Sequence, residues 1–167
     1  MRLYLTGRFC IEHGGTLLDE RRFPGRQGRL AFAMLVAERR PIPRDELAEA
    51  LWPGELPRSW DTALSAVVSN LRALLVTVGL SRGDCITTSF GCYELRLPRD
   101  TWIDLEAAVA ALDEAEGALR SGDHRRAWGW VGVTTAIARR PFLPGETSPW
   151  VERKRDELRG LLLRGLD

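Results

Sequence analysis

Residues 59–78, SWDTALSAVVSNLRALLVTV, predict a helix with two sharply different faces. Apolar side chains recur at spacings of three and four residues, which places them on one stripe of a helix. The stripe consists of Leu64, Val67, Val68, Leu71, Leu74, Leu75 and Val78. The opposite face carries Thr62, Ala66, Ser69 and Ala73, flanked by Ser65 and Arg72 on one side and by Asn70 and Thr77 on the other. A helix face that meets only water usually carries charged residues, so this small, uncharged face is unusual and favours a functional role. The alternative is a core helix of the kind found in any small α+β protein.

Residues 85–97, CITTSFGCYELRL, predict a β-hairpin shortly after that helix. Two β-like runs, 85–88 and 93–97, flank the tetrapeptide SFGC. In the second run apolar Tyr93, Leu95 and Leu97 alternate with charged residues, which is the period of a strand with one buried face.

The segments before residue 59 predict a small antiparallel sheet and two helices. Residues 2–13 alternate in polarity, residues 13–15 form a turn, and residues 16–19 offer a second short strand. Residues 26–40 have apolar side chains at helical spacing and are ended by Pro41. A short helix over residues 44–52 follows Pro43 and stops at a Pro-Gly pair.

The rest of the chain is helical in pattern. One helix is expected from Asp104 to about Arg120, a second to about Arg140 and a third over residues 150–166. The Ser-Gly-Asp break between the first two is typical of a tetratricopeptide-like pair of helices. The predicted fold class is therefore α+β: a winged helix with an N-terminal antiparallel sheet and a C-terminal hairpin wing, then tetratricopeptide-like helices. We expect two domains, residues 1–99 and 100–167.

Composition is that of an ordinary globular protein, with 44% hydrophobic and 28% charged residues among 167. The net charge is +1, and residues 1–100 hold 14 arginines against 12 acidic residues, so charge alone gives no sign of nucleic-acid binding. Lys154 is the one lysine among 24 basic residues. No segment resembles a signal peptide or approaches the roughly 20 apolar residues that cross a membrane, so a cytoplasmic location is expected.

The sequence carries no recognisable catalytic or metal-binding pattern. Three cysteines, Cys10, Cys85 and Cys92, have no C-x-x-C spacing, and His13 and His124 complete no zinc-site pattern with them. Phosphate-binding loops, nucleophile elbows and paired-histidine motifs are missing as well. We therefore expect a protein without enzyme activity, cofactor or metal.

Several blocks resemble one family of bacterial transcription regulators. Residues 30–35, RPIPRDELAEALW (40–52), VSNLRALL (68–75) and GCYEL (91–95) resemble the DNA-binding domains of the Streptomyces antibiotic regulatory protein (SARP) type, which are relatives of the OmpR and PhoB effector domains. FLPG (142–145), WVE (150–152) and Arg155 resemble a loop and helix of the bacterial transcriptional activator domain (BTAD) that follows in that family. Residues 100–167 are shorter than that whole domain, so only its beginning is expected here.

The resemblance implies that residues 60–78 are a recognition helix for the DNA major groove and residues 85–97 a wing. Asn70 would pair with an adenine edge or a phosphate, and Arg72 with guanine or a phosphate. The residues predicted to face DNA are Arg58, Thr62, Ser65, Ala66, Ser69, Asn70, Arg72, Thr87 and Ser89. The implied function is a DNA-binding transcription regulator, an activator, which reads promoter repeats. Double-stranded DNA, RNA polymerase and a second copy of the chain are the implied partners.

The chain departs from the family where charge matters. Many relatives carry arginines near positions 69 and 70 and near position 89, where this chain has Ser69, Asn70 and Ser89. Each missing phosphate contact lowers affinity, so binding is expected to depend on head-to-tail pairs of modules on direct repeats. An alternative is a degenerate winged helix that serves as a protein-interaction or ligand-sensing module. Individual residues also have plainer interpretations: Arg72 as an intramolecular partner, and Thr87 and Ser89 as ordinary hairpin residues.

Overall fold

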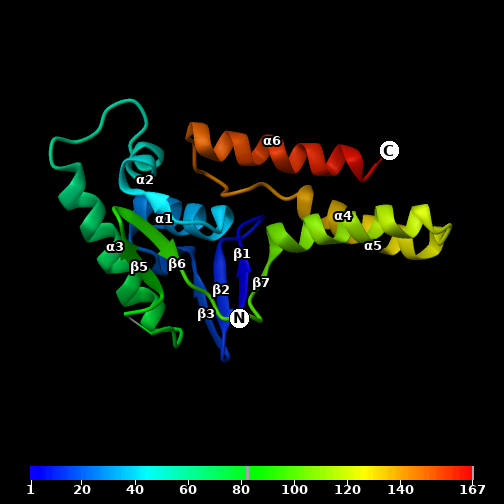
Figure 1. Cartoon of the computed structure of the whole chain (residues 1–167), viewed down its shortest axis with the longest axis horizontal. Coiled ribbons are helices and arrows are strands. Elements are labelled where there is room, and N and C mark those ends of the chain that lie inside the picture. Colours follow the sequence, from blue (N-terminus) through cyan, green and yellow to red (C-terminus); the bar gives the residue numbers. More distant parts are fainter. Residues whose placement is uncertain (82, 167) are drawn as a thin grey trace. The chain divides into compact units, whose positions relative to one another are not determined.

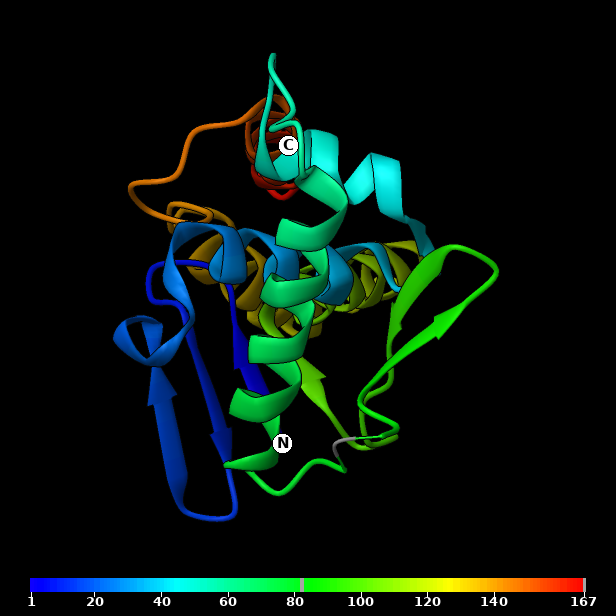
Figure 2. The same cartoon turned by 90° about the vertical axis from the view of Figure 1, so that its left-hand side faces the viewer.

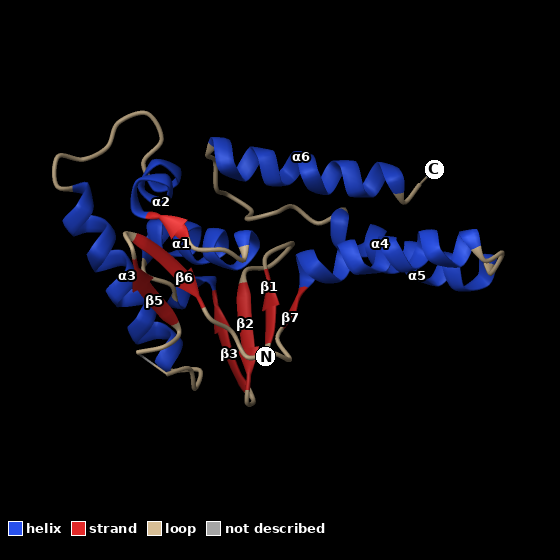
Figure 3. Cartoon of the chain, viewed as in Figure 1, coloured by secondary structure: helices blue, strands red, loops and turns tan. Residues whose placement is uncertain are grey.

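The computed structural model describes residues 1–81 and 83–166, which form two compact units. The first unit contains Met1 and Cys10–Thr101, and the second contains Arg2–Phe9 and the chain from Trp102 onward. Residues 2–9, which belong to the first of the two predicted domains, therefore pack in the second unit. Figure 1 shows the elements in chain order, and Figure 3 separates helices from strands.

The first unit has the element order of a winged helix. Its elements are β2 (Cys10–His13), β3 (Thr16–Asp19), the 3-10 turn η1 (Glu20–Arg22), α1 (Gly25–Glu38), β4 (Ile42–Pro43), α2 (Arg44–Leu51), α3 (Trp60–Val76), β5 (Ile86–Ser89) and β6 (Cys92–Leu95). Strands β2 and β3 pair antiparallel, from Cys10 opposite Asp19 to His13 opposite Thr16. A second antiparallel sheet has the order β4-β6-β5. The predicted sheet, three helices and terminal hairpin are thus confirmed.

Helix α1 forms the centre of the first unit. Every side chain from Leu30 to Val36 is buried, including Phe32, whose ring lies 5.3 Å from that of Phe23. Helices α2 and α3 and strand β6 pack around α1 and contribute Leu47, Leu71 and Tyr93 to the same core. Burying a large apolar side chain is worth about 1.5–3 kcal/mol, so this core supports the position of α3.

The second unit is a pair of short strands and three helices. Its elements are β1 (Arg2–Tyr4), β7 (Trp102–Ile103), α4 (Asp104–Arg120), α5 (His124–Ala138) and α6 (Pro149–Arg164). Strands β1 and β7 pair parallel, with Arg2 opposite Trp102. This pairing had no signal in the sequence, because the two segments lie about a hundred residues apart. No helix in the described ranges 1–81 and 83–166 is long and apolar enough to cross a membrane.

Helices α4 and α5 pack closely through small side chains. The buried face of α4 is built from Ala108, Ala111, Ala115 and Ala118 together with Leu112. Thr134 of α5 is fully buried and donates a 3.2 Å hydrogen bond to the Ala108 carbonyl. Asp123 begins α5 by accepting a hydrogen bond from the Arg126 backbone N–H, as N-cap residues do. The predicted helical hairpin at the Ser-Gly-Asp turn is confirmed.

Asp104 explains why the predicted single strand over residues 2–13 is divided in two. Its Oδ2 accepts hydrogen bonds from Leu5 N at 2.9 Å, Thr6 N at 2.8 Å and Thr6 Oγ1 at 2.8 Å. Gly7 then turns the chain with a positive φ of 72°. Residues 5 and 6 thus direct their N–H groups to a buried carboxylate at the start of α4. Burial raises the pKa of Asp104, and these hydrogen bonds partly offset that rise.

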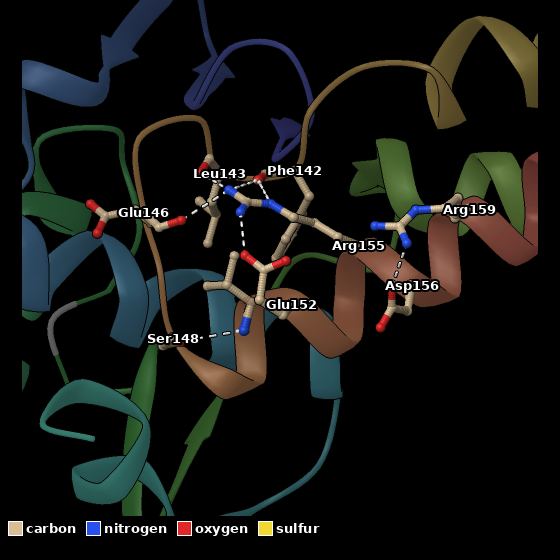
Figure 4. Close-up of polar contacts among 9 residues, drawn as sticks. Phe142, Leu143, Glu146, Ser148, Glu152, Arg155, Asp156 and Arg159 are labelled. Carbon is tan, nitrogen blue, oxygen red and sulfur yellow. Dashed lines mark hydrogen bonds and ion pairs between the residues drawn. The ribbon is translucent and has the colours of Figure 1, made fainter. Parts of the chain in front are cut away.

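Arg155 holds the loop between α5 and α6 (Figure 4). Its guanidinium donates to the carbonyl oxygens of Phe142, Leu143 and Glu146 at 2.9–3.1 Å. It also contacts Glu152 Oε1 at 2.5 Å, one turn before it on α6. The side chains of the loop residues Phe142 and Leu143 are buried. Arg155 is therefore the centre of a local hydrogen-bond cluster within the second unit.

Candidate nucleic-acid interface

Helix α3 presents the two faces that its sequence predicts. The side chains of Leu64, Val68, Leu71 and Leu75 are completely buried against the rest of the first unit. The outward face is exposed along its whole length and consists of Thr62, Ser65, Ala66, Ser69, Asn70 and Ala73. No residue of this set carries a charge, and most have small side chains. The backbone of α3 can therefore approach a partner surface closely along this face.

The predicted interface residues lie on three neighbouring segments of the first unit. Five of them, Thr62, Ser65, Ala66, Ser69 and Asn70, share the exposed face of α3. Arg58 is exposed in the loop immediately before α3, and Ser89 is exposed at the end of β5, where Thr87 is half-buried. Figure 2 shows α3 facing the viewer with the β5–β6 hairpin beside it.

Arg72, also predicted to face DNA, ties α3 to the wing. Its Nε donates to the Ile86 carbonyl at 2.9 Å, and its Nη2 donates to Thr88 Oγ1 at 2.8 Å. Both acceptors lie on β5. The side chain is half-buried, so much of its hydrogen-bonding capacity is committed inside the unit. These bonds make Arg72 an intramolecular partner of the hairpin, and its contact with DNA stays a prediction.

Arg44, which sequence reasoning did not select, joins α2, α3 and β6. Its guanidinium forms an ion pair with Asp61 and donates to Tyr93 Oη at 2.7 Å and to Ser65 Oγ at 2.9 Å. Its backbone N–H donates to the Gly91 carbonyl in the wing turn at 3.0 Å. In the sequence Arg44 is simply the first residue of a short helix. No local pattern signals that it connects three elements.

Arg44 changes the chemistry of the exposed face of α3. Ser65 Oγ donates to the Asp61 carbonyl at 2.9 Å while it accepts from Arg44, so its hydroxyl is already engaged. The ion pair with Arg44 neutralises the exposed Asp61 at the first turn of α3. The remaining polar groups on the face, Thr62, Ser69 and Asn70, can donate and accept hydrogen bonds without carrying charge.

The described part of the chain, residues 1–81 and 83–166, contains no cluster of three or more His, Cys, Asp or Glu side chains suited to a metal ion. Cys10 and Cys85 are buried free thiols, and Cys92 is a half-buried one. Burial raises the pKa of the Cys85 thiol, which disfavours the reactive thiolate.

An open helix face, a hairpin held beside it and a following helical pair define a winged helix joined to a helical unit. Among solved structures, the fold matches EmbR of Mycobacterium tuberculosis, whose structure is a complex with a low-affinity phosphopeptide. The TM-score is 0.87 at 26% sequence identity, over 99% of this chain. The match spans 43% of the EmbR chain, less than half its length. The chain thus has a SARP-like, EmbR-like fold. No family model and no curated protein matches the sequence.

Proposed function

We propose that the chain is a transcription regulator that binds double-stranded DNA, with α3 in the major groove and the β5–β6 hairpin as a wing. The observation that carries this proposal is the exposed, uncharged face of α3 from Thr62 to Ala73. The major groove is about 12 Å wide, and a helix must bring its backbone close to the base edges to read them. Small side chains permit that approach. A helix face exposed only to water would not need small, uncharged side chains.

In this proposal the side chains of α3 contact the bases, and residues next to α3 contact the DNA phosphates. Asn70 and Ser69 are the side chains best suited to base edges, because amide and hydroxyl groups read donor and acceptor patterns. Arg58, exposed before the helix, is suited to a phosphate. Arg72 and Arg44 hold the wing in place relative to α3.

The low charge of this surface makes paired binding part of the proposal. Each phosphate contact contributes about 0.9 to the slope of log affinity against log salt, so few contacts mean weak binding and a shallow slope. Two modules on direct repeats would recover affinity through their high effective concentration. The resemblance to SARP regulators supports this arrangement. It also supports activation of transcription, with the helical unit contacting RNA polymerase or a second copy.

The EmbR match supports regulation but no phosphopeptide site. The phosphopeptide belongs to the EmbR structure, of which this chain matches 43%. The proposed partner of this chain is therefore DNA, and the proposed location is the cytoplasm, where a promoter is accessible.

The test is a selection from a duplex library with a random core of about 40 base pairs. The full chain is incubated with the library at low salt, and the bound DNA is sequenced over several rounds. We expect enrichment of tandem repeats spaced by about one helical turn, 10–10.5 base pairs. Anisotropy titrations of the selected duplex at several salt concentrations then give affinity and slope. Folded protein that enriches no sequence and binds no duplex at low salt would contradict the proposal.

One observation favours a second candidate, a protein-binding module. The exposed face of α3 carries no charged side chain, and the guanidinium groups of Arg72 and Arg44 beside it are bonded within the unit. A neutral face with exposed Ala66 and Ala73 also fits a partner helix packed closely against it. A blank DNA selection, together with salt-insensitive capture of an α-helical partner, would favour this candidate.

A further inference from the structure

The turn of the wing has a backbone conformation that its sequence does not favour. Ser89 pairs with Cys92, so β5 and β6 are joined by the two residues Phe90 and Gly91 alone. Both have positive φ, 48° and 72°. A two-residue hairpin turn of this kind prefers Asn-Gly, Asp-Gly or Gly-Gly, because side chains other than Asn and Asp resist the left-handed region. Gly91 fits this preference and Phe90 does not.

Phe90 is also fully exposed. Its relative exposure is 103%, the highest among the exposed large hydrophobic side chains of the described residues. A large aromatic side chain normally stabilises a fold by leaving water. Here the ring gains no burial and its backbone is strained, so folding gives no reason for phenylalanine at this position.

The surroundings of Phe90 select the type of contact. Thr88, Ser89 and Gly91 are exposed and uncharged, and the sequence from 86 to 93 contains no charged residue. The turn itself therefore offers no charged side chain to a phosphate, and the guanidinium groups of Arg72 and Arg44 beside it are bonded to Thr88 and Asp61. Its strongest available interaction is stacking or wedging of an aromatic ring, which apolar side chains make between base steps in the minor groove.

The position of the turn is fixed relative to α3. Arg72 bonds to Ile86 and Thr88 on β5, and the Arg44 N–H bonds to the Gly91 carbonyl in the turn itself. Phe90 lies two residues beyond Thr88, about 7 Å further along the strand. Figure 2 shows the turn standing apart from α3 on one side. With α3 in the major groove, a projection to its side meets the neighbouring minor groove.

We propose that Phe90 is an apolar wedge that enters the minor groove beside the bound major groove and partly unstacks one base step. This inference rests on the proposed DNA-binding function and adds a source of specificity to it. Pyrimidine–purine steps such as TA and CA/TG unstack most easily, so the selected sites should carry one at the wing position. The bound duplex should bend there.

The decisive variant is Phe90→Asn in the full chain. Asparagine tolerates the left-handed conformation, so the turn should become more stable and Tm should rise by about 2 °C or more. Affinity for the selected duplex should instead fall about tenfold, within the range measured for loss of one aromatic stacking contact. A variant that folds better and binds worse separates contact with DNA from a structural role. Phe90→Leu keeps an apolar wedge and should recover part of the affinity.

Unstacking of the base step can be measured by fluorescence of the DNA. A 2-aminopurine placed at the wing-proximal step should brighten when wild-type protein unstacks it and should stay dim with Phe90→Asn. Equal affinity of wild type and Phe90→Asn, or no brightening with bound wild type at any step, would overturn the inference and leave DNA binding intact. A wild-type chain that binds no duplex would overturn the proposed function and this inference together.

Discussion

The loop held by Arg155 and the hairpin held by Arg72 use the same chemistry to different ends. Arg155 donates to three backbone carbonyls of one loop and fixes that loop, in which Phe142 is buried. Arg72 donates to one backbone carbonyl and one exposed threonine hydroxyl, and it fixes a hairpin that otherwise projects into solvent. The first arginine completes a packed interior. The second positions a surface.

A chain with 23 arginines can therefore present a helix face, that of α3, without a charged side chain. A guanidinium group has five N–H donors in a rigid fork, which suits backbone carbonyls as well as phosphates. Near α3, Arg72 and Arg44 are used in this internal way. In the proposed function, sequence specificity would then depend on the uncharged side chains of α3 and on the shape of the wing.

The largest effect is expected from Arg155→Ala. The substitution leaves the carbonyl oxygens of three buried residues without their donor, and the free energy of unfolding should fall by about 3 kcal/mol. Chemical denaturation of the full chain measures it. Arg159→Ala is the matched control, because Arg159 pairs with Asp156 at 2.9 Å on the same helix while both side chains are about two-thirds exposed. The control should lose less than about 0.5 kcal/mol. Equal losses of stability in the two variants would mean that the bonds of Arg155 to the loop contribute no more than the exposed Arg159–Asp156 pair.

A smaller effect is expected from Arg72→Ala, which releases the wing from α3. Two hydrogen bonds are lost, so stability should fall by about 1–2 kcal/mol, and affinity for DNA should fall with it. Thr88→Val is the matched variant, because it removes one partner of Arg72, keeps the charge and keeps a β-branched residue in the strand. If Arg72 acts by positioning, both variants weaken binding and neither changes the salt slope. A slope reduced by about 0.9 in Arg72→Ala alone would mean a direct phosphate contact.

The third prediction concerns the buried polar contacts of Asp104. Because burial raises its pKa, the folded chain keeps this proton at a pH where the unfolded chain has lost it. The contribution of Asp104 to stability is therefore greatest below its ordinary pKa of 3.8 and declines as pH rises through the raised value. The stability of wild type minus that of Asp104→Asn should fall with pH across this window, by about 1.4 kcal/mol for each unit of pKa difference.

Denaturation of both proteins from about pH 4 to pH 7 would show the decline. A difference that grows with pH would mean that the hydrogen bonds from Leu5, Thr6 and Leu105 outweigh burial and favour the ionised form.

The features that could be predicted from the sequence are those that depend on the periodicity of apolar residues. The exposed and buried faces of α3 follow from a spacing of three and four residues, and the hairpin follows from alternation around Tyr93 and Leu95. Helix α4 begins and ends at the predicted residues, Asp104 and Arg120. These features are local, so neighbouring residues carry enough information to place them.

What the sequence did not predict depends on contacts between distant residues. The parallel pairing of β1 with β7 and the bonds from Leu5 and Thr6 to Asp104 join positions about a hundred residues apart. The roles of Arg44 and Arg72 also depend on tertiary contacts. The sequence around an arginine does not show whether its guanidinium binds a phosphate or a backbone carbonyl. Phe90 was visible in the hairpin sequence, but its positive φ and full exposure became apparent only in the fold.

The smallest effect is expected from Arg58→Ala, and it bears most directly on the contrast between internal and outward arginines. Arg58 is exposed just before α3, and no residue that the structure describes accepts a hydrogen bond from its guanidinium. Its removal should leave stability unchanged within about 0.5 kcal/mol and lower DNA affinity a few-fold. The salt slope should fall by about 0.9, because one phosphate contact is lost, and Arg58→Lys should restore it because the charge is kept. A slope that is the same in wild type and Arg58→Ala would place Arg58 away from the DNA, and the recognition surface would then have to bind without help from this arginine.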